Sequence, residues 1–130
     1  MRRLEGPELA SYDVLDPHLA RRVRILRAPI LPRNADGMTI GRWIFLTQDR
    51  HRHGDRPLLA HELVHVRQYA DLGYLRFSWR YLRDYTRNLI RLRRGRAAYL
   101  AIPAEIEARR ETAEWQDRHR RRTRAVDPTT

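Results

Sequence analysis

The chain has 130 residues, of which 33% are charged, and its 27 basic and 16 acidic side chains give a formal net charge of +11. Cysteine is absent, which excludes a disulfide framework, a cysteine-ligated zinc and a thiol nucleophile. The positive excess, carried entirely by arginine, favours polyanions such as nucleic acid, anionic lipid or an acidic protein. No apolar run has the length of a membrane span, and the first residues lack the apolar core of a secretory signal, so we expect a cytoplasmic protein.

The first half of the chain predicts a short arm followed by a small sheet. Residues 1–20 carry two prolines and scattered apolar positions, which predicts a weakly ordered N-terminal arm with one short turn of helix near residues 18–21. Residues 21–27 alternate arginine with apolar side chains, as a strand with one wet face does. A turn signal separates them from a second extended segment, residues 38–47, where Gly41 predicts a bulge or bend. We expect the two segments to pair as an antiparallel sheet.

A polar loop, residues 48–57, precedes the most informative stretch of the sequence. Its histidines, His51 and His53, lie among arginines that would repel a cation, so we interpret the segment as a solvated loop. Asp55 is placed to cap the helix that follows.

The apolar run Leu58 to Tyr69 contains His61-Glu62-Leu63-Val64-His65, an HExxH pattern. On a helix, residues four apart lie on one face, about 6 Å apart along the axis. His61 and His65 can therefore ligate one Zn²⁺, and Glu62 can act on a water molecule as general base. Apolar residues beside this face predict a helix that is buried on most sides.

A second long helix is expected over residues 75–94. Its apolar residues predict a buried seam, formed by Leu75, Leu82, Tyr85, Leu89 and Leu92 and supported by Phe77, Trp79 and Tyr81. Arginines recur at steps of three and four along another face, at Arg76, Arg80, Arg83, Arg87, Arg91 and Arg94. This stripe from Arg76 to Arg94 is either a solvated face or a contact surface for phosphates and other polyanions.

A catalytic zinc site needs a third protein ligand besides the two histidines. One candidate is Asp71, at the last position of an HExxHxxGxxD pattern, although Gln68 stands where that pattern has its glycine. The other candidates are Glu105 and Glu107 on a third helix that begins near Pro103.

The two glutamates lie two residues apart, so they cannot both face one metal. Glu107 shares its face with charged residues. Glu105 shares its face with small and apolar residues suited to packing against the first helix, namely Ala101, Ala108, Thr112 and Trp115. This difference favours Glu105 over Glu107.

The motif HELVHVRQ, residues 61–68, followed by Glu105-Ile106-Glu107-Ala108, resembles the minimal gluzincin pattern HExxH…E. With the extended segment before the helix, it is similar to small bacterial zincin-like domains of unassigned function, which are related in motif to the core domain found with extracellular contractile injection systems. The resemblance covers residues 21–115. It implies Zn²⁺ on His61, His65 and Glu105, with Glu62 activating water. Family members often place an aspartate four residues after the ligand glutamate, to support a histidine, and here that position is Arg109.

The resemblance implies a zincin-like α+β fold: a small antiparallel sheet, the HExxH helix, a second long helix and a C-terminal helix that bears the glutamate. We expect an arm at residues 1–20, the zincin-like domain at 21–117 and a basic, disordered tail at 118–130.

The leading hypothesis for function is a zinc-dependent metallopeptidase that acts on a peptide or protein. An extended substrate would add to the sheet edge at residues 41–46, and Tyr81, Tyr85 and Tyr99 remain open as donors to the oxyanion. The alternatives are a catalytically silent zincin-like scaffold, as part of a larger secretion or toxin system, and a basic module that binds nucleic acid or another polyanion.

Overall fold

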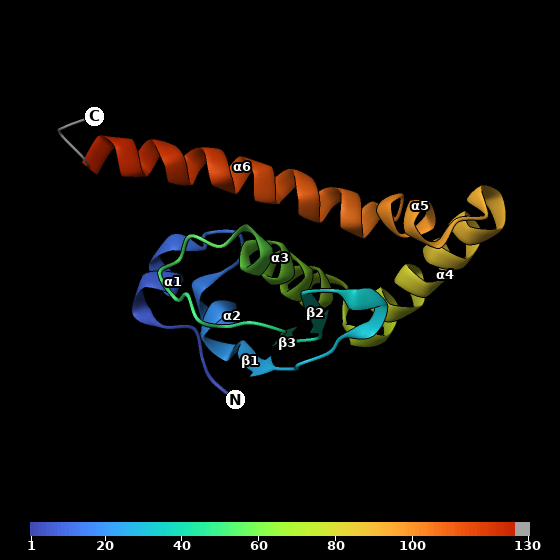
Figure 1. The fold of residues 1–130 in the computed structure, drawn as a ribbon, viewed down its shortest axis with the longest axis horizontal. Coiled ribbons are helices and arrows are strands. Elements are labelled where there is room, and N and C mark those ends of the chain that lie inside the picture. The colour runs from blue at the N-terminus through green and yellow to red at the C-terminus, as the bar shows by residue number, and fades with distance from the viewer. Residues whose placement is uncertain (127–130) are drawn as a thin grey trace.

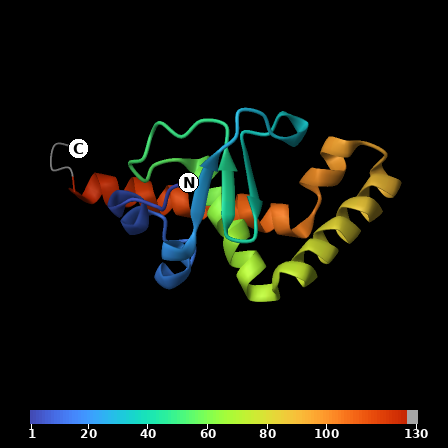
Figure 2. The same cartoon turned by 90° about the horizontal axis from the view of Figure 1, so that it is seen from below.

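The computed structural model describes residues 1–126, and these form an α+β fold. A three-stranded sheet lies on one side of the central helix α3, Pro57–Leu72, and the long helix α6, Pro103–Val126, crosses its other side (Figures 1 and 2). Helix α4, Tyr74–Leu92, and the short helix α5, Gly95–Leu100, extend from one end of this body. The expected α+β class is confirmed.

The sheet is mixed, with the order β1-β3-β2. Strand β1, Arg24–Arg27, pairs in parallel with β3, Trp43–Leu46, which pairs antiparallel with β2, Gly37–Ile40. The prediction of a purely antiparallel sheet from two segments is therefore wrong. The second segment folds into a hairpin, because Gly41 adopts a positive φ of 63° and reverses the chain where we expected a bulge or bend.

The N-terminal residues belong to the core. Instead of a weakly ordered arm, residues 1–20 contain helix α1, Gly6–Ser11. The short turn of helix expected near residues 18–21 is confirmed as part of helix α2, Pro17–Arg22. Tyr12 is buried, with its ring centroid 5.2 Å from that of Trp115 on α6. The indole nitrogen of Trp115 also donates to the Ser11 carbonyl oxygen at 2.9 Å. These contacts hold the N-terminal segment, at Ser11 and Tyr12, against helix α6.

Helix α3 is the centre of the core. Its apolar residues Leu59, Leu63 and Val66 are at most 1% exposed, as the sequence pattern predicts, whereas Ala70, on the same predicted stripe, is exposed. Val64, on another face, is also buried. Pro57 occupies its first turn, but the N-cap is Arg56 without a side-chain cap, so the expected capping by Asp55 is not seen.

Two predictions for the later helices differ from the structure. On α4 the expected seam is mostly exposed, with Leu75 at 81% and Leu82 at 58%. Of the aromatic residues expected to support it, Phe77 is buried, whereas Trp79 is 66% exposed; Asn88 is the other buried residue of this helix. Helix α6 continues to Val126, so residues 118–126 of the expected tail are helical; residues 127–130 lie outside the described part. Within residues 1–126, no helix combines the length and the hydropathy that crossing a membrane requires.

Candidate metal centre

Three potential ligands converge between α3 and α6. His61 and His65 lie one turn apart on α3, and Glu105 faces them from the first turn of α6. His61 Nε2 lies 3.0 Å from Glu105 Oε2, His65 Nε2 lies 3.1 Å from Glu105 Oε1, and the two Nε2 atoms are 3.2 Å apart. Burial is high: the side chain of Glu105 is 4% exposed and that of His65 is 8% exposed.

The donor set fits a zinc ion. Two imidazole nitrogens and one carboxylate oxygen are common zinc ligands, and the ligand atoms of a tetrahedral zinc lie about 3.3 Å from one another. The distances of 3.0 to 3.2 Å between these atoms are close to that separation. Among the described residues, these three form the one group of potential ligands compact enough to hold a metal ion.

The α6 face that carries Glu105 packs as its sequence predicts. Ala108 and Trp115 are fully buried and Thr112 is 8% exposed, so this face of the helix lies in the interior. The other candidates point elsewhere. The Glu107 side chain is 42% exposed and pairs with Arg67, whereas the Asp71 side chain is 70% exposed. Neither is part of the cluster with His61 and His65.

The charges in the cluster stabilise one another. Burial alone would raise the pKa of Glu105, but hydrogen bonds with His61, His65 and Tyr81 outweigh burial and hold it well below its ordinary value. Burial alone would lower the pKa of His65, but the hydrogen bond and the charge of Glu105 raise it. Glu105 is therefore a carboxylate in this site, stabilised by the hydrogen bonds and positive charge that it faces.

Gln68, which we did not predict as a site residue, orients His65. Its Nε2 donates to Ala104 O at 3.0 Å and to Glu107 Oε1 at 3.1 Å, which turns its Oε1 toward His65 Nδ1 at 2.8 Å. An amide oxygen only accepts, so Nδ1 carries a proton and donates to it; in the neutral ring that a metal ion requires, the lone pair is then on Nε2, the atom that faces Glu105. Gln68 thus supplies the support that the sequence lacks at Arg109, which instead donates to Leu100 O.

Glu62 lies beside the sheet and is 5% exposed. Thr39 Oγ1 on β2 lies 2.6 Å from Glu62 Oε2, to which it donates, and 3.1 Å from the Glu62 carbonyl oxygen. Packing is also tight at Gly37, where an added Cβ would lie 3.2 Å from Glu62 Oε1. Strand β2 therefore fixes the carboxylate from the side.

The sequence offers three tyrosines as possible donors to the oxyanion, and two of them lie near the cluster. Tyr81 donates to Glu105 Oε1 at 2.8 Å, and Tyr99 lies near enough for the charge of Glu105 to act on its phenol. Burial and the charge of Glu105 raise the pKa of both phenols well above the ordinary value, so both keep their protons. Tyr85 contacts Arg33 instead: the guanidinium carbon of Arg33 lies 4.4 Å from the centroid of the Tyr85 ring.

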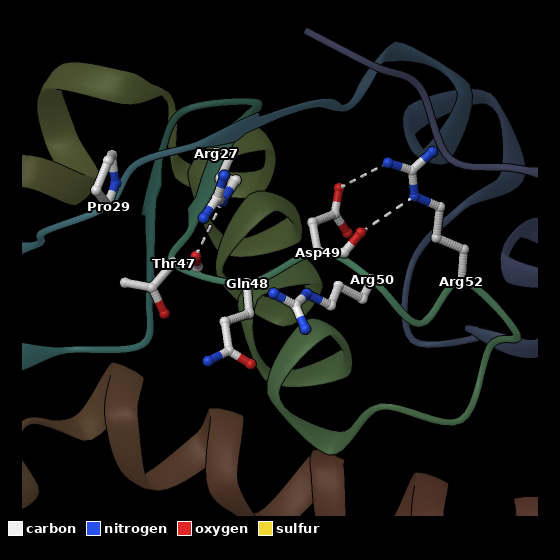
Figure 3. A pocket seen from close by; sticks show the side chains of 7 residues that line it. All are labelled: Arg27, Pro29, Thr47, Gln48, Asp49, Arg50 and Arg52. Carbon is white, nitrogen blue, oxygen red and sulfur yellow. Dashed lines mark hydrogen bonds and ion pairs between the residues drawn. The ribbon is translucent and has the colours of Figure 1, made fainter.

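The loop histidines and a surface pocket near them in sequence are separate from this centre. His51 and His53 are exposed and are not part of the cluster. A pocket of about 430 Å³ lies beside the loop after β3, lined by Arg27, Pro29, Thr47, Gln48, Asp49, Arg50 and Arg52 (Figure 3). Its one carboxylate, Asp49, is already paired with arginines, so this pocket is not a second metal site.

Comparison with protein families gives one match. Residues 30–73 match the family described as the eCIS core domain. No curated protein and no solved structure matches the chain. The matched segment comprises β2, β3 and α3, and it therefore includes His61, Glu62 and His65 but ends before Glu105. Over these 44 of its 130 residues, the chain is similar to the eCIS core domain.

Proposed function

We propose that the protein is a zinc-dependent metallopeptidase, with His61, His65 and Glu105 as metal ligands and Glu62 as general base. The observation that carries this proposal is the convergence of two imidazole nitrogens and a buried carboxylate at 3.0 to 3.2 Å. The HExxH spacing adds a glutamate on the same helix.

The residues divide the chemistry among them. When bound, zinc supplies a Lewis acid that polarises the substrate carbonyl and lowers the pKa of water to about 7. Glu62, held by Thr39, takes the proton of the attacking water and returns it to the leaving amine. Gln68 keeps the Nε2 lone pair of His65 available, and Tyr81 holds the Glu105 carboxylate in position.

The substrate would bind along β2. The sequence predicts that a substrate strand adds at residues 41–46, but β3 occupies the middle of the sheet, with both sides paired. Among the described strands, the edge nearer to Glu62 belongs to β2, whose Thr39 contacts that glutamate. An extended peptide that pairs with residues 37–40 would therefore run past Glu62.

Metal analysis and a peptide digest test the proposal together. Tag-free protein is expected to hold about one zinc per chain, lost in His61→Ala and Glu105→Ala. Glu62→Gln should keep the zinc yet fail to produce new termini in a mixed peptide library analysed by mass spectrometry. Glu114→Gln, at an exposed glutamate of α6, is the matched control and should keep both properties.

Two results would contradict the proposal. Protein that takes up no zinc even after incubation with the metal would remove the metal centre. Hydrolysis by Glu62→Gln at the rate of the unmodified protein would remove Glu62 as the base.

A further inference from the structure

Helix α4 carries an apolar face that residues 1–126 leave uncovered. Leu75, Trp79, Leu82 and Ile90 are 81%, 66%, 58% and 74% exposed, and Leu89 is 38% exposed. At about 100° per residue, these five side chains occupy one arc of about 100°. The helix is not anchored by this arc: Phe77, Tyr81 and Asn88, on the opposite side, make its contacts with Tyr69, Glu105 and Ala98.

A basic face lies directly beside the apolar one. Arg76, Arg80, Arg83, Arg87 and Arg91 fall in the adjacent arc, and all five are exposed. The only acidic residue of α4 is Asp84, which pairs with Arg83. Within residues 1–126, no carboxylate forms an ion pair with the other four arginines. Exposed leucine, isoleucine and tryptophan beside a row of arginines is the pattern of a helix that lies in a membrane interface.

We propose that α4 docks this apolar and arginine-lined surface on an anionic lipid membrane. The apolar side chains enter the boundary between headgroups and acyl chains, and the arginines reach the lipid phosphates and carboxylates. Trp79 is on the side of the apolar arc nearer to the arginines, and an indole ring is favoured at the boundary between the apolar and polar regions of a membrane. Because α4 extends from one end of the molecule, it can meet a flat surface (Figure 1).

Charge and apolarity together select this occupant. A second copy of the chain would bring one arginine row against another, which costs electrostatic energy. Nucleic acid would satisfy the arginines but leave the five apolar side chains in water. An anionic bilayer complements both faces at once. The inference is independent of zinc and of peptidase activity, so it is tested separately from them.

The test uses the full chain with phosphatidylcholine vesicles that contain or lack phosphatidylserine. We expect sedimentation with the anionic vesicles and a blue shift of tryptophan emission that is absent in Trp79→Phe. Trp79→Ser combined with Leu82→Ser should weaken binding at least about tenfold, because two apolar side chains no longer leave water. Ile106→Ser, at a half-exposed position of α6, is the matched control and should bind as the unmodified protein does.

A second set of variants separates the arginine face from net charge. Replacing Arg76, Arg80 and Arg87 by glutamine should weaken vesicle binding by about fivefold for each arginine. The same replacement of Arg120, Arg121 and Arg124 on α6 lowers the net charge equally and should have a clearly smaller effect.

Three outcomes would overturn the proposal. Equal losses from the two arginine triplets, or full binding by the Trp79 and Leu82 double variant, would show attraction by charge alone. No vesicle binding, together with a dimer in sedimentation that the double variant dissociates, would assign the apolar face to self-association. Capture of nucleic acid but not vesicles, lost in the Arg76, Arg80 and Arg87 variant, would assign the basic face to a nucleic acid.

Discussion

At the residue scale, Gln68 connects the candidate metal centre with the rest of α6. Its amide accepts from His65 Nδ1 on one side and donates to Ala104 O and Glu107 Oε1 on the other. Because Gln68 is 7% exposed, these bonds are shielded from water. One side chain thus sets both the tautomer of His65 and its distance from α6.

Replacing Gln68 by alanine should weaken zinc binding without unfolding the protein. Loss of such an outer partner lowers metal affinity by about 10- to 100-fold, because the imidazole loses its orientation and some basicity. Competition with a chromophoric chelator measures the change. Gln116→Ala, farther along α6 than the cluster, is the control. An unchanged zinc affinity in Gln68→Ala would contradict the role assigned to Gln68.

The sequence could predict which residues converge here but not what orients them. The helical period places His61 and His65 on one face, and the neighbours of Glu105 show that its side of the helix is buried. Gln68 carries only a weak signal, three residues after His65, because its partners Ala104 and Glu107 become neighbours through the packing of two helices distant in sequence.

At the element scale, periodicity identified apolar faces but not their partners. On α6 the face with Ala108 and Trp115 packs inward, as expected. On α4 the apolar face stays exposed, because the neighbouring helices contact the opposite side of the helix, which holds Phe77 and Asn88. The pairing of β1 with β3 was missed for a similar reason. Strand partners depend on where the chain reverses, and Gly41 is one residue within an otherwise continuous extended pattern.

The packing of α6 against α3 should control the metal centre. Ala108 lies fully buried one turn after Glu105, so Ala108→Leu adds three carbons to a filled space and pushes the helices apart. We expect a loss of about 2 kcal/mol in the free energy of unfolding. Zinc affinity should also fall about tenfold, as when outer support of a metal ligand is lost.

Urea denaturation and chelator competition measure these two effects of Ala108→Leu. Ala113→Leu, at an exposed position of the same helix, should change neither quantity by much. An Ala108→Leu protein that is destabilised but binds zinc normally would show that the spacing of the helices does not determine the geometry of the site.

At the scale of the whole molecule, an ion-pair network joins the N-terminus to the loop before α3. Arg2 donates to both Glu8 and Asp49, and Asp49 also pairs with Arg52 and Arg56. The side chain of Glu8 is fully buried and that of Asp49 is 9% exposed. This network, with the contact of Tyr12 and Trp115, makes residues 1–20 an integral part of the fold.

The network should make stability depend on acid pH through Asp49. Burial alone would raise the pKa of Asp49, but the hydrogen bond from Arg2 and the charges of Arg52 and Arg56 lower it below its ordinary value. A carboxyl whose pKa is lower in the folded state stabilises the fold above its unfolded pKa, about 3.9. That stabilisation is lost as pH falls from about 4 through the folded pKa.

Asp49→Asn should therefore destabilise the protein at neutral pH by about 2 kcal/mol, the value of a hydrogen bond to a charged group. Because the native carboxylate becomes protonated in acid, the difference between variant and native protein should shrink below about pH 4. Urea midpoints at neutral and acid pH, with metal removed by chelator, give this comparison.

Asp117→Asn, whose exposed carboxylate pairs with Arg120 on α6, should differ little from native protein at either pH. An Asp49→Asn deficit of equal size at both pH values would mean that the side chain stabilises the loop through packing rather than through its charge.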